Sequence, residues 1–155
     1  MFARRLLVAV ALAVTALGLT AVPAEAAPTL LITKVYVNTP GKDRPATNTK
    51  VNAEYTNIKN YGSTPRNLTG WTLRDKAGHV YTFPEFVLAP GKIVTVKNGT
   101  GKDTSRYLHW GNGYYIWNNT GDTATLRGKT GTLVDTCTWG KRGKEYEKPQ
   151  YQLCV

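Results

Sequence analysis

The histidines and serines are the side chains of this sequence that could support nucleophilic or acid–base catalysis. His79 and His109 are the two imidazoles, and the serines are Ser63 and Ser105. Neither serine lies in a G-x-S-x-G context, and a hydrolytic site needs a nucleophile, a base and an orienting group that converge. The sequence therefore supplies no recognisable nucleophile–base pair.

The carboxylates are few and scattered along the chain. Those that fall in or beside predicted turns are Asp75, Asp103, Asp122 and Asp135. An aspartate in a turn normally accepts hydrogen bonds from nearby backbone N–H groups. No H-E-x-x-H, P-loop or dinucleotide-binding motif is present, and D-K-A-G-H supplies too few oxygen ligands for calcium. We predict no catalytic residue, no cofactor, no metal site and no small-molecule substrate.

Aromatic and basic residues could instead bind an anionic polymer. The chain has 20 Lys and Arg against 10 Asp and Glu, which gives a net charge of +10. In the glycine-rich stretch 109–115 we expect Trp110 and Tyr114 to be exposed, where rings can stack on a ligand. The locally clustered cations are Lys141, Arg142 and Lys144 in the tail, and Lys42, Arg44 and Lys50 in the first long loop. A weak attraction to every anion is the alternative interpretation of this charge.

β-strands must position these side chains, because no window repeats apolar residues with helical periodicity. Strand-like segments recur between clusters of Gly, Asn, Asp and Pro. They cover residues 30–37, 51–60, 66–74, 80–83, 92–97, 123–127 and 132–138. Short strands at this spacing, without helices, predict an all-β antiparallel sandwich.

The stretch L-T-G-W-T-L-R-D at 68–75 raises the question of whether Trp71 faces a core or a ligand. The alternation after Gly70 is typical of a half-buried strand, which favours the core. The predicted core residues are Ile58, Trp71, Leu73 and Trp117.

The two ends of the chain differ from the middle. Arg4 and Arg5 precede an apolar run and Ala24-Glu25-Ala26, which predicts a cleaved signal peptide over 1–26. An uncleaved membrane anchor is the alternative, and no later stretch is long and apolar enough to span a membrane. Residues 27–139 then form one domain, and 140–155 form a basic tail.

The chain has two cysteines, Cys137 and Cys154. In an exported protein such a pair predicts one disulfide, which here tethers the tail to an upstream strand. Two reduced thiols or an intermolecular bridge are the alternatives.

Four segments occur in an order that resembles a known family. They are Glu54-x-x-x-Ile58-x-Asn60-x-Gly62, Leu68-x-Gly70-Trp71-x-Leu73-x-Asp75, Phe83 to Leu88-Ala89-Pro90-Gly91, and Trp117-Asn118-x-x-Gly121-Asp122-x-x-x-Leu126 ending near Val134-Asp135. Together they resemble the lamin tail domain, in the small secreted form found in actinobacteria.

The resemblance implies an immunoglobulin-like sandwich in which Gly70-Trp71 enters a core strand and Trp71 packs between the sheets. The family has no established catalytic residue that could be assigned to this chain. The resemblance implies a module for adhesion or targeting. The family often has an apolar residue and a Glu where this chain has Thr56 and Asn57. If that carboxylate binds a ligand in relatives, we do not expect this chain to bind the same ligand.

Our leading hypothesis is a secreted, monomeric, non-catalytic module that binds an acidic polymer or another cell-surface component. The expected contacts are Lys141, Arg142 and Lys144, with stacking from Trp110 and Tyr114. The competing hypothesis is a structural or protein–protein interaction module whose charge is incidental. A hydrolase that depends on His79 or His109 is a third hypothesis.

Overall fold

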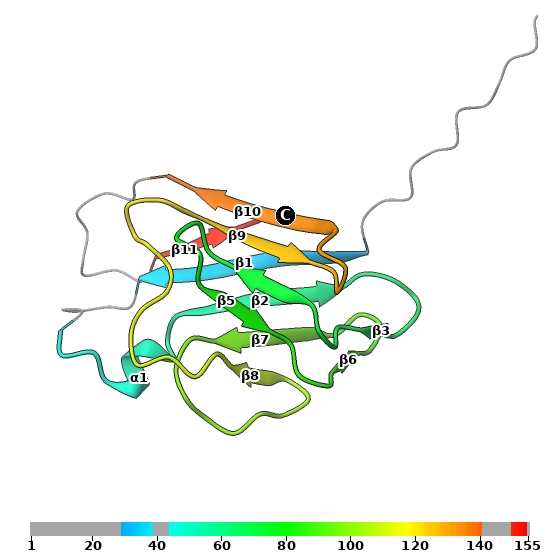
Figure 1. The fold of residues 1–155 in the computed structure, drawn as a ribbon, viewed down its shortest axis with the longest axis horizontal. Coiled ribbons are helices and arrows are strands. Elements are labelled where there is room, and N and C mark those ends of the chain that lie inside the picture. The colour runs from blue at the N-terminus through cyan, green and yellow to red at the C-terminus, as the bar shows by residue number, and fades with distance from the viewer. Residues whose placement is uncertain (1–28, 39–43, 141–149, 155) are drawn as a thin grey trace, which may run out of the picture.

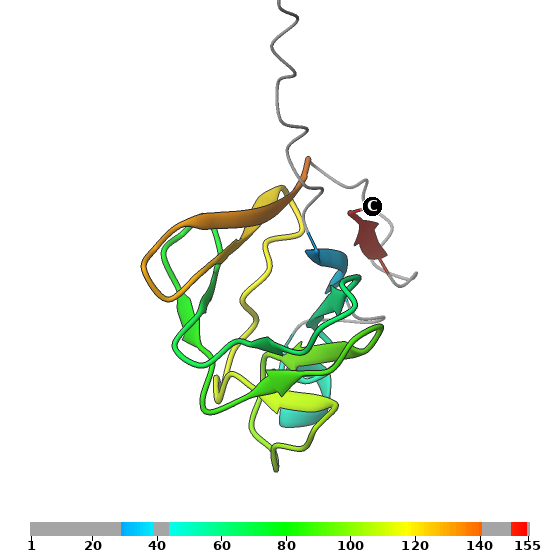
Figure 2. The same cartoon turned by 90° about the vertical axis from the view of Figure 1, so that its right-hand side faces the viewer.

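The computed structural model describes residues 29–38, 44–140 and 150–154, which form two layers of β-sheet packed face to face (Figures 1 and 2). The predicted signal peptide at 1–26 lies outside the described residues, and so do Lys141, Arg142 and Lys144. Among the residues described, none forms a helix with the length and apolarity that a membrane crossing requires.

One layer is a five-stranded sheet with the strand order β11-β1-β2-β7-β8. Its strands are β11 (Gln150–Leu153), β1 (Leu30–Asn38), β2 (Tyr55–Asn60), β7 (Ile93–Lys97) and β8 (Tyr107–His109). Neighbouring strands are antiparallel except β7 and β8, which are parallel. The connection over residues 98–106 carries the chain back to the end at which β7 began. The predicted antiparallel sandwich is thus confirmed with one parallel pair added.

The second layer is a four-stranded sheet with the order β10-β9-β4-β5. Its strands are β10 (Leu133–Trp139), β9 (Asp122–Arg127), β4 (Thr72–Arg74) and β5 (Val80–Thr82). A small separate sheet pairs β3 (Arg66–Asn67) with β6 (Val87–Leu88). The prediction of one strand over 66–74 was wrong, because Gly70 adopts a φ of +76° and turns the chain between β3 and β4.

A short helix, α1 (Asn48–Val51), occupies part of the first loop, where no helix was predicted. The Thr47 side chain accepts a hydrogen bond from the Lys50 backbone N–H and caps the helix. Val51 is buried and anchors the turn. Consequently β2 begins at Tyr55 and not at residue 51.

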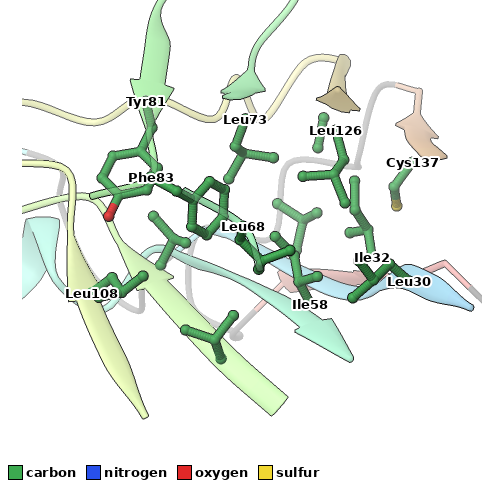
Figure 3. Packing of buried hydrophobic residues seen from close by; sticks show 14 of the residues in the cluster. Leu30, Ile32, Ile58, Leu68, Leu73, Tyr81, Phe83, Leu108, Leu126 and Cys137 are labelled. Carbon is green, nitrogen blue, oxygen red and sulfur yellow. The ribbon is translucent and has the colours of Figure 1, made fainter. Parts of the chain in front are cut away.

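The hydrophobic core fills the space between the two sheets. Figure 3 shows Leu73 and Leu126 of the four-stranded sheet pointing toward Ile32 and Ile58 of the five-stranded sheet. Ile58 and Leu73 are fully buried, and Trp117 is 2% exposed. These three predicted core residues are thus buried, Ile58 and Leu73 on strands and Trp117 in the segment between β8 and β9.

Trp71 lies at the margin of the core and not between the sheets as expected. Its side chain is half-buried and packs against the core cluster. Its backbone N–H donates to the Leu68 carbonyl, and its carbonyl accepts from the Phe83 N–H. These bonds hold Trp71 in the turn that follows Gly70, one residue before β4 begins.

The Cys137–Cys154 disulfide joins β10 of one layer to the residue that follows β11 of the other. The two Cα atoms are 5.4 Å apart. β11 pairs along β1 with Tyr36 opposite Tyr151 and Lys34 opposite Leu153. This strand, which the polar tail sequence did not suggest, covers the edge that β1 would otherwise expose.

Candidate functional site

The outer side of the five-stranded sheet carries aromatic and basic side chains. Successive side chains of a strand point to opposite faces, so the burial of Val35 and Val37 places Lys34 and Tyr36 outside. The same alternation in β2, β7, β8 and β11 adds further residues, and Arg106 reaches the surface from just before β8. We call this surface the tyrosine–lysine face, formed by Lys34, Tyr36, Tyr55, Lys97, Arg106, Tyr107 and Tyr151. It looks away from the four-stranded sheet (Figure 2).

Strand register aligns four of these side chains in one row across the strands. Tyr36 of β1 lies opposite both Tyr151 of β11 and Tyr55 of β2, and Tyr55 lies opposite Lys97 of β7. At a strand spacing of about 4.8 Å this row is about 14 Å long. The Tyr36 ring stacks on Tyr55 at 5.2 Å between centroids and on Tyr151 at 6.4 Å. The row is therefore an ordered stack and not a set of independent side chains.

Cations lie against the rings at both ends of the row. The Lys34 Nζ lies 4.4 Å from the centroid of the Tyr151 ring. At the other end, Lys97 Nζ and Arg106 Cζ lie 4.9 Å and 5.3 Å from the centroid of Tyr107. Contacts of this kind hold a cation in place while leaving its N–H groups available to an anion. A depression of about 520 Å³ adjoins the second group, and its lining includes Tyr36, Tyr55, Lys97, Arg106 and Tyr107.

The positive charge of this face is not neutralised within the described ranges. None of the outward-facing side chains of β1, β2 and β7 is acidic. Lys34, Lys97 and Arg106 have no carboxylate partner among the residues described. Burial raises the pKa of Tyr36, and burial together with Tyr36 raises the pKa of Tyr55. Both phenols therefore remain protonated hydrogen-bond donors at any physiological pH.

The buried carboxylates lie elsewhere and hold the backbone together. Glu54, Asp75 and Asp122 line a depression of about 710 Å³ beside the 115–122 loop. Glu54 Oε2 accepts from the backbone N–H groups of Ile116 and Trp117 at 3.2 and 3.3 Å. Asn98 Nδ2 donates to the same oxygen at 2.8 Å. This carboxylate thus fixes the start of the loop.

Asp122 ties two further turns together in the same region. Its Oδ1 accepts from the N–H groups of Lys76 and Thr123, and its Oδ2 accepts from the N–H of Asn118. Asp75 in turn accepts from the N–H groups of Gly78 and His79 at 2.7 Å each. As predicted for turn aspartates, these oxygens bond to backbone groups, which makes their role structural.

Each histidine is paired with an aspartate. His79 Nδ1 lies 2.6 Å from Asp75 Oδ2, and His109 Nδ1 lies 3.0 Å from Asp103 Oδ1. Such a pair orients an imidazole, but catalysis also needs a nucleophile within reach. No hydrogen bond in the described ranges joins either imidazole to a hydroxyl. Those ranges also contain no group of three or more His, Cys, Asp or Glu side chains suited to a metal ion.

The structure separates the binding residues predicted from the sequence. Trp110 is half-buried and packs against Trp117 and Tyr81 at 5.9 and 5.7 Å, so the expected exposed stacking position is not found. Tyr114 is exposed and shares a depression of about 640 Å³ with Arg44. The three tail cations lie outside the described residues, so their contribution stays a prediction.

Sequence reasoning missed the tyrosine–lysine face. The signal was present in T-K-V-Y-V at 33–37, where Lys34 and Tyr36 alternate with apolar residues. The apolar positions of this segment indicate the core. The polar and aromatic positions between them indicate the outer face, and the prediction did not use them. The alignment of Tyr151 could not be found in this way, because it depends on the pairing of β11 with β1.

Comparison with known proteins gives one finding. The family model described as Lamin Tail Domain matches residues 23–141, which is more than half of the chain. The matched range begins inside the predicted signal peptide and includes ten of the eleven described strands. A search of curated proteins finds no match.

Proposed function

The chain belongs to the lamin tail domain family, a family of non-enzymatic immunoglobulin-like modules, and on this basis we propose that it is a secreted binding module for an acidic polymer. The polymer classes are cell-wall polymers, acidic polysaccharides and extracellular nucleic acid. The observation that supports the proposal is the tyrosine–lysine face, whose cations lack acidic partners within the described ranges.

The shape of this face suits an extended chain. The row from Tyr151 to Lys97 crosses four strands, and on the fifth strand Tyr107 lies opposite Thr95, two residues along β7 from Lys97. A long anion that crosses the strands can contact several cations in succession, and each contact releases counterions. A small anion could contact only one cation at a time, so the other members of the row would add little to its affinity.

An extracellular location is part of the proposal. The Cys137–Cys154 disulfide is of the kind that persists in oxidising compartments. The predicted signal peptide over 1–26 agrees with this location. Outside the cell, acidic polymers are the abundant partners for a chain whose net charge is +9 once residues 1–26, with Arg4, Arg5 and Glu25, are removed.

The test compares two charge-matched triple variants on immobilised polymers across a salt series. The face variant carries Lys34→Gln, Lys97→Gln and Arg106→Gln. The control variant carries three substitutions on the other sheet and its turn, Arg74→Gln, Lys76→Gln and Lys129→Gln. We expect retention of the parent to fall steeply with salt, and the salt slope of the face variant to be smaller by about 2, at roughly 0.7 per lost contact with a flexible single strand.

The control variant has the same net charge as the face variant but keeps Lys34, Lys97 and Arg106, so it should bind within about threefold of the parent. Equal losses in both variants would mean that the charge acts generically. If the parent is retained on no polyanion, the proposal fails and the protein–protein interaction hypothesis takes its place. A third variant with Lys141, Arg142 and Lys144 changed to Gln measures the contribution predicted for the tail.

A further inference from the structure

We propose that the tyrosine–lysine face recognises a single phosphodiester chain through its phosphate oxygens, and not through stacking on whatever groups the chain carries. This inference rests on the proposed function and specifies the ligand of the same face. It follows from what the rings and the hydroxyls of the tyrosines already contact.

Contacts within the row occupy both sides of the Tyr36 ring and one side each of the Tyr55 and Tyr151 rings. Tyr36 lies between Tyr55 and Tyr151, one on each neighbouring strand, with interplanar angles of 16° and 17°. A planar ligand group could reach the faces of Tyr36 only by opening this stack. Tyr151 already contacts Lys34, and Tyr107 already contacts Lys97 and Arg106. Stacking on these rings would therefore replace favourable contacts that the free protein has already made.

The hydroxyl edges are free. In the part of the chain that the structure describes, the hydroxyls of Tyr36, Tyr55 and Tyr151 make no hydrogen bond. The three rings are nearly parallel and stand in one row across the strands. Each phenol can donate one hydrogen bond, and burial keeps Tyr36 and Tyr55 protonated. The row thus offers neutral donors between cations at its two ends.

The mixture of donors suits phosphate. The planar fork of arginine pairs with phosphate as well as with carboxylate, and an ammonium group binds phosphate as a point charge. The face uses Lys34 and Lys97 with a single arginine, Arg106. Hydroxyl donors add contacts to the free oxygens of each phosphate. A phosphodiester repeats this group at regular intervals, as the row repeats its donors across the strands.

The first arm of the test varies the ligand. Affinity of the disulfide-bonded protein is measured for an oligothymidylate, an abasic oligonucleotide of equal length, heparin and polygalacturonate at one ionic strength. We expect the two oligonucleotides to bind within about threefold of each other and both to bind more tightly than polygalacturonate and heparin. A tenfold or larger preference for the thymidylate, or for heparin or polygalacturonate, overturns the inference while leaving polymer binding intact.

The second arm varies the hydroxyls. Tyr36→Phe, Tyr55→Phe and Tyr151→Phe together keep the ring stack and remove three donors, and Tyr61→Phe, at an exposed tyrosine outside the row, is the control. We expect the triple variant to lose at least tenfold in affinity for the abasic oligonucleotide, since a hydrogen bond to a charged group is worth about 1.5 kcal/mol or more. An unchanged affinity overturns the inference. If the parent binds none of the four polymers, the proposed function fails as well.

Discussion

At the scale of single residues, the acidic and basic side chains of this protein have different roles. The buried carboxylates of Glu54, Asp75 and Asp122 accept hydrogen bonds from backbone N–H groups of the loops around them. They therefore do not neutralise Lys34 and Lys97, which lie on the outer side of the five-stranded sheet. This explains why the surface is basic and why its described residues form no Asp–Lys pair.

Asp122 provides a test of the structural role. Asp122→Asn should lower the free energy of unfolding by about 3 kcal/mol, because the amide has a single acceptor oxygen for three N–H groups. Chemical denaturation monitored by tryptophan fluorescence measures the change. The exposed Glu85→Gln is the control and should stay within about 0.5 kcal/mol of the parent. A loss below 1 kcal/mol for Asp122→Asn would contradict the assignment.

Tyr81 provides a second test, through the pH dependence of stability. Its hydroxyl is buried and has no hydrogen-bond partner among the described residues. Burial, and to a lesser extent the charge of Asp103, raise the pKa of Tyr81 above the ordinary tyrosine value. The unfolded state then releases the proton at lower pH than the folded state. The stability linked to this group is therefore complete below about pH 10 and is lost as the pH rises further.

Tyr81→Phe should raise the free energy of unfolding at pH 7 by about 1 kcal/mol, because it removes an unsatisfied buried hydroxyl. Between pH 7 and pH 11 the free energy of unfolding should also decrease less in this variant than in the parent. Denaturation at the two pH values measures both effects, and the exposed Tyr61→Phe should leave both unchanged. Destabilisation by Tyr81→Phe at pH 7 would show that the hydroxyl has a partner.

At the scale of elements, the strand pattern predicted where strands exist more reliably than how they pair. The segments 30–37, 80–83, 92–97, 123–127 and 132–138 correspond to β1, β5, β7, β9 and β10 with small shifts at the ends. The segment 66–74 was predicted as one strand because its apolar residues continue through Gly70. The positive φ of this glycine, which divides the segment between two sheets, depends on tertiary packing.

β11 is the element whose position depends most on a covalent bond. It is a four-residue strand at the sheet edge, and the disulfide closes a separation of 17 residues. Changing Cys137 and Cys154 together to Ser should lower the free energy of unfolding by about 3 kcal/mol. Affinity for an anionic polymer should fall as well, because Tyr151 leaves the row. Denaturation and a binding titration on the same sample measure the two effects.

Tyr151→Ala with the disulfide intact separates these effects. It should reduce polymer affinity while changing stability by less than the double cysteine variant does, since Tyr151 is 43% exposed. If the cysteine variant binds polymer as the parent does, β11 contributes nothing to the face.

At the scale of the whole molecule, the sandwich places core residues and the proposed recognition surface on the two sides of one sheet. The inner side of the five-stranded sheet supplies core residues such as Ile32, Ile58 and Leu108 (Figure 3). Its outer side carries the tyrosine–lysine face. The fold class and most of the core could be predicted, because apolar alternation is a local property of each strand. The site could not, because its members come from five strands whose order in the sheet is not their order in the sequence.

The pairing of β1 with β11 has a consequence for the timing of biosynthesis. β1 is the first described strand to be synthesised and β11 is the last, so the Tyr36–Tyr151 contact cannot form during most of translation. While the cysteines remain reduced, nothing covalent retains β11 beside β1. On our proposal, the chain acquires its full affinity only after oxidation, in the compartment where the disulfide forms. The same proposal predicts that the reduced chain binds nucleic acid more weakly than the oxidised chain.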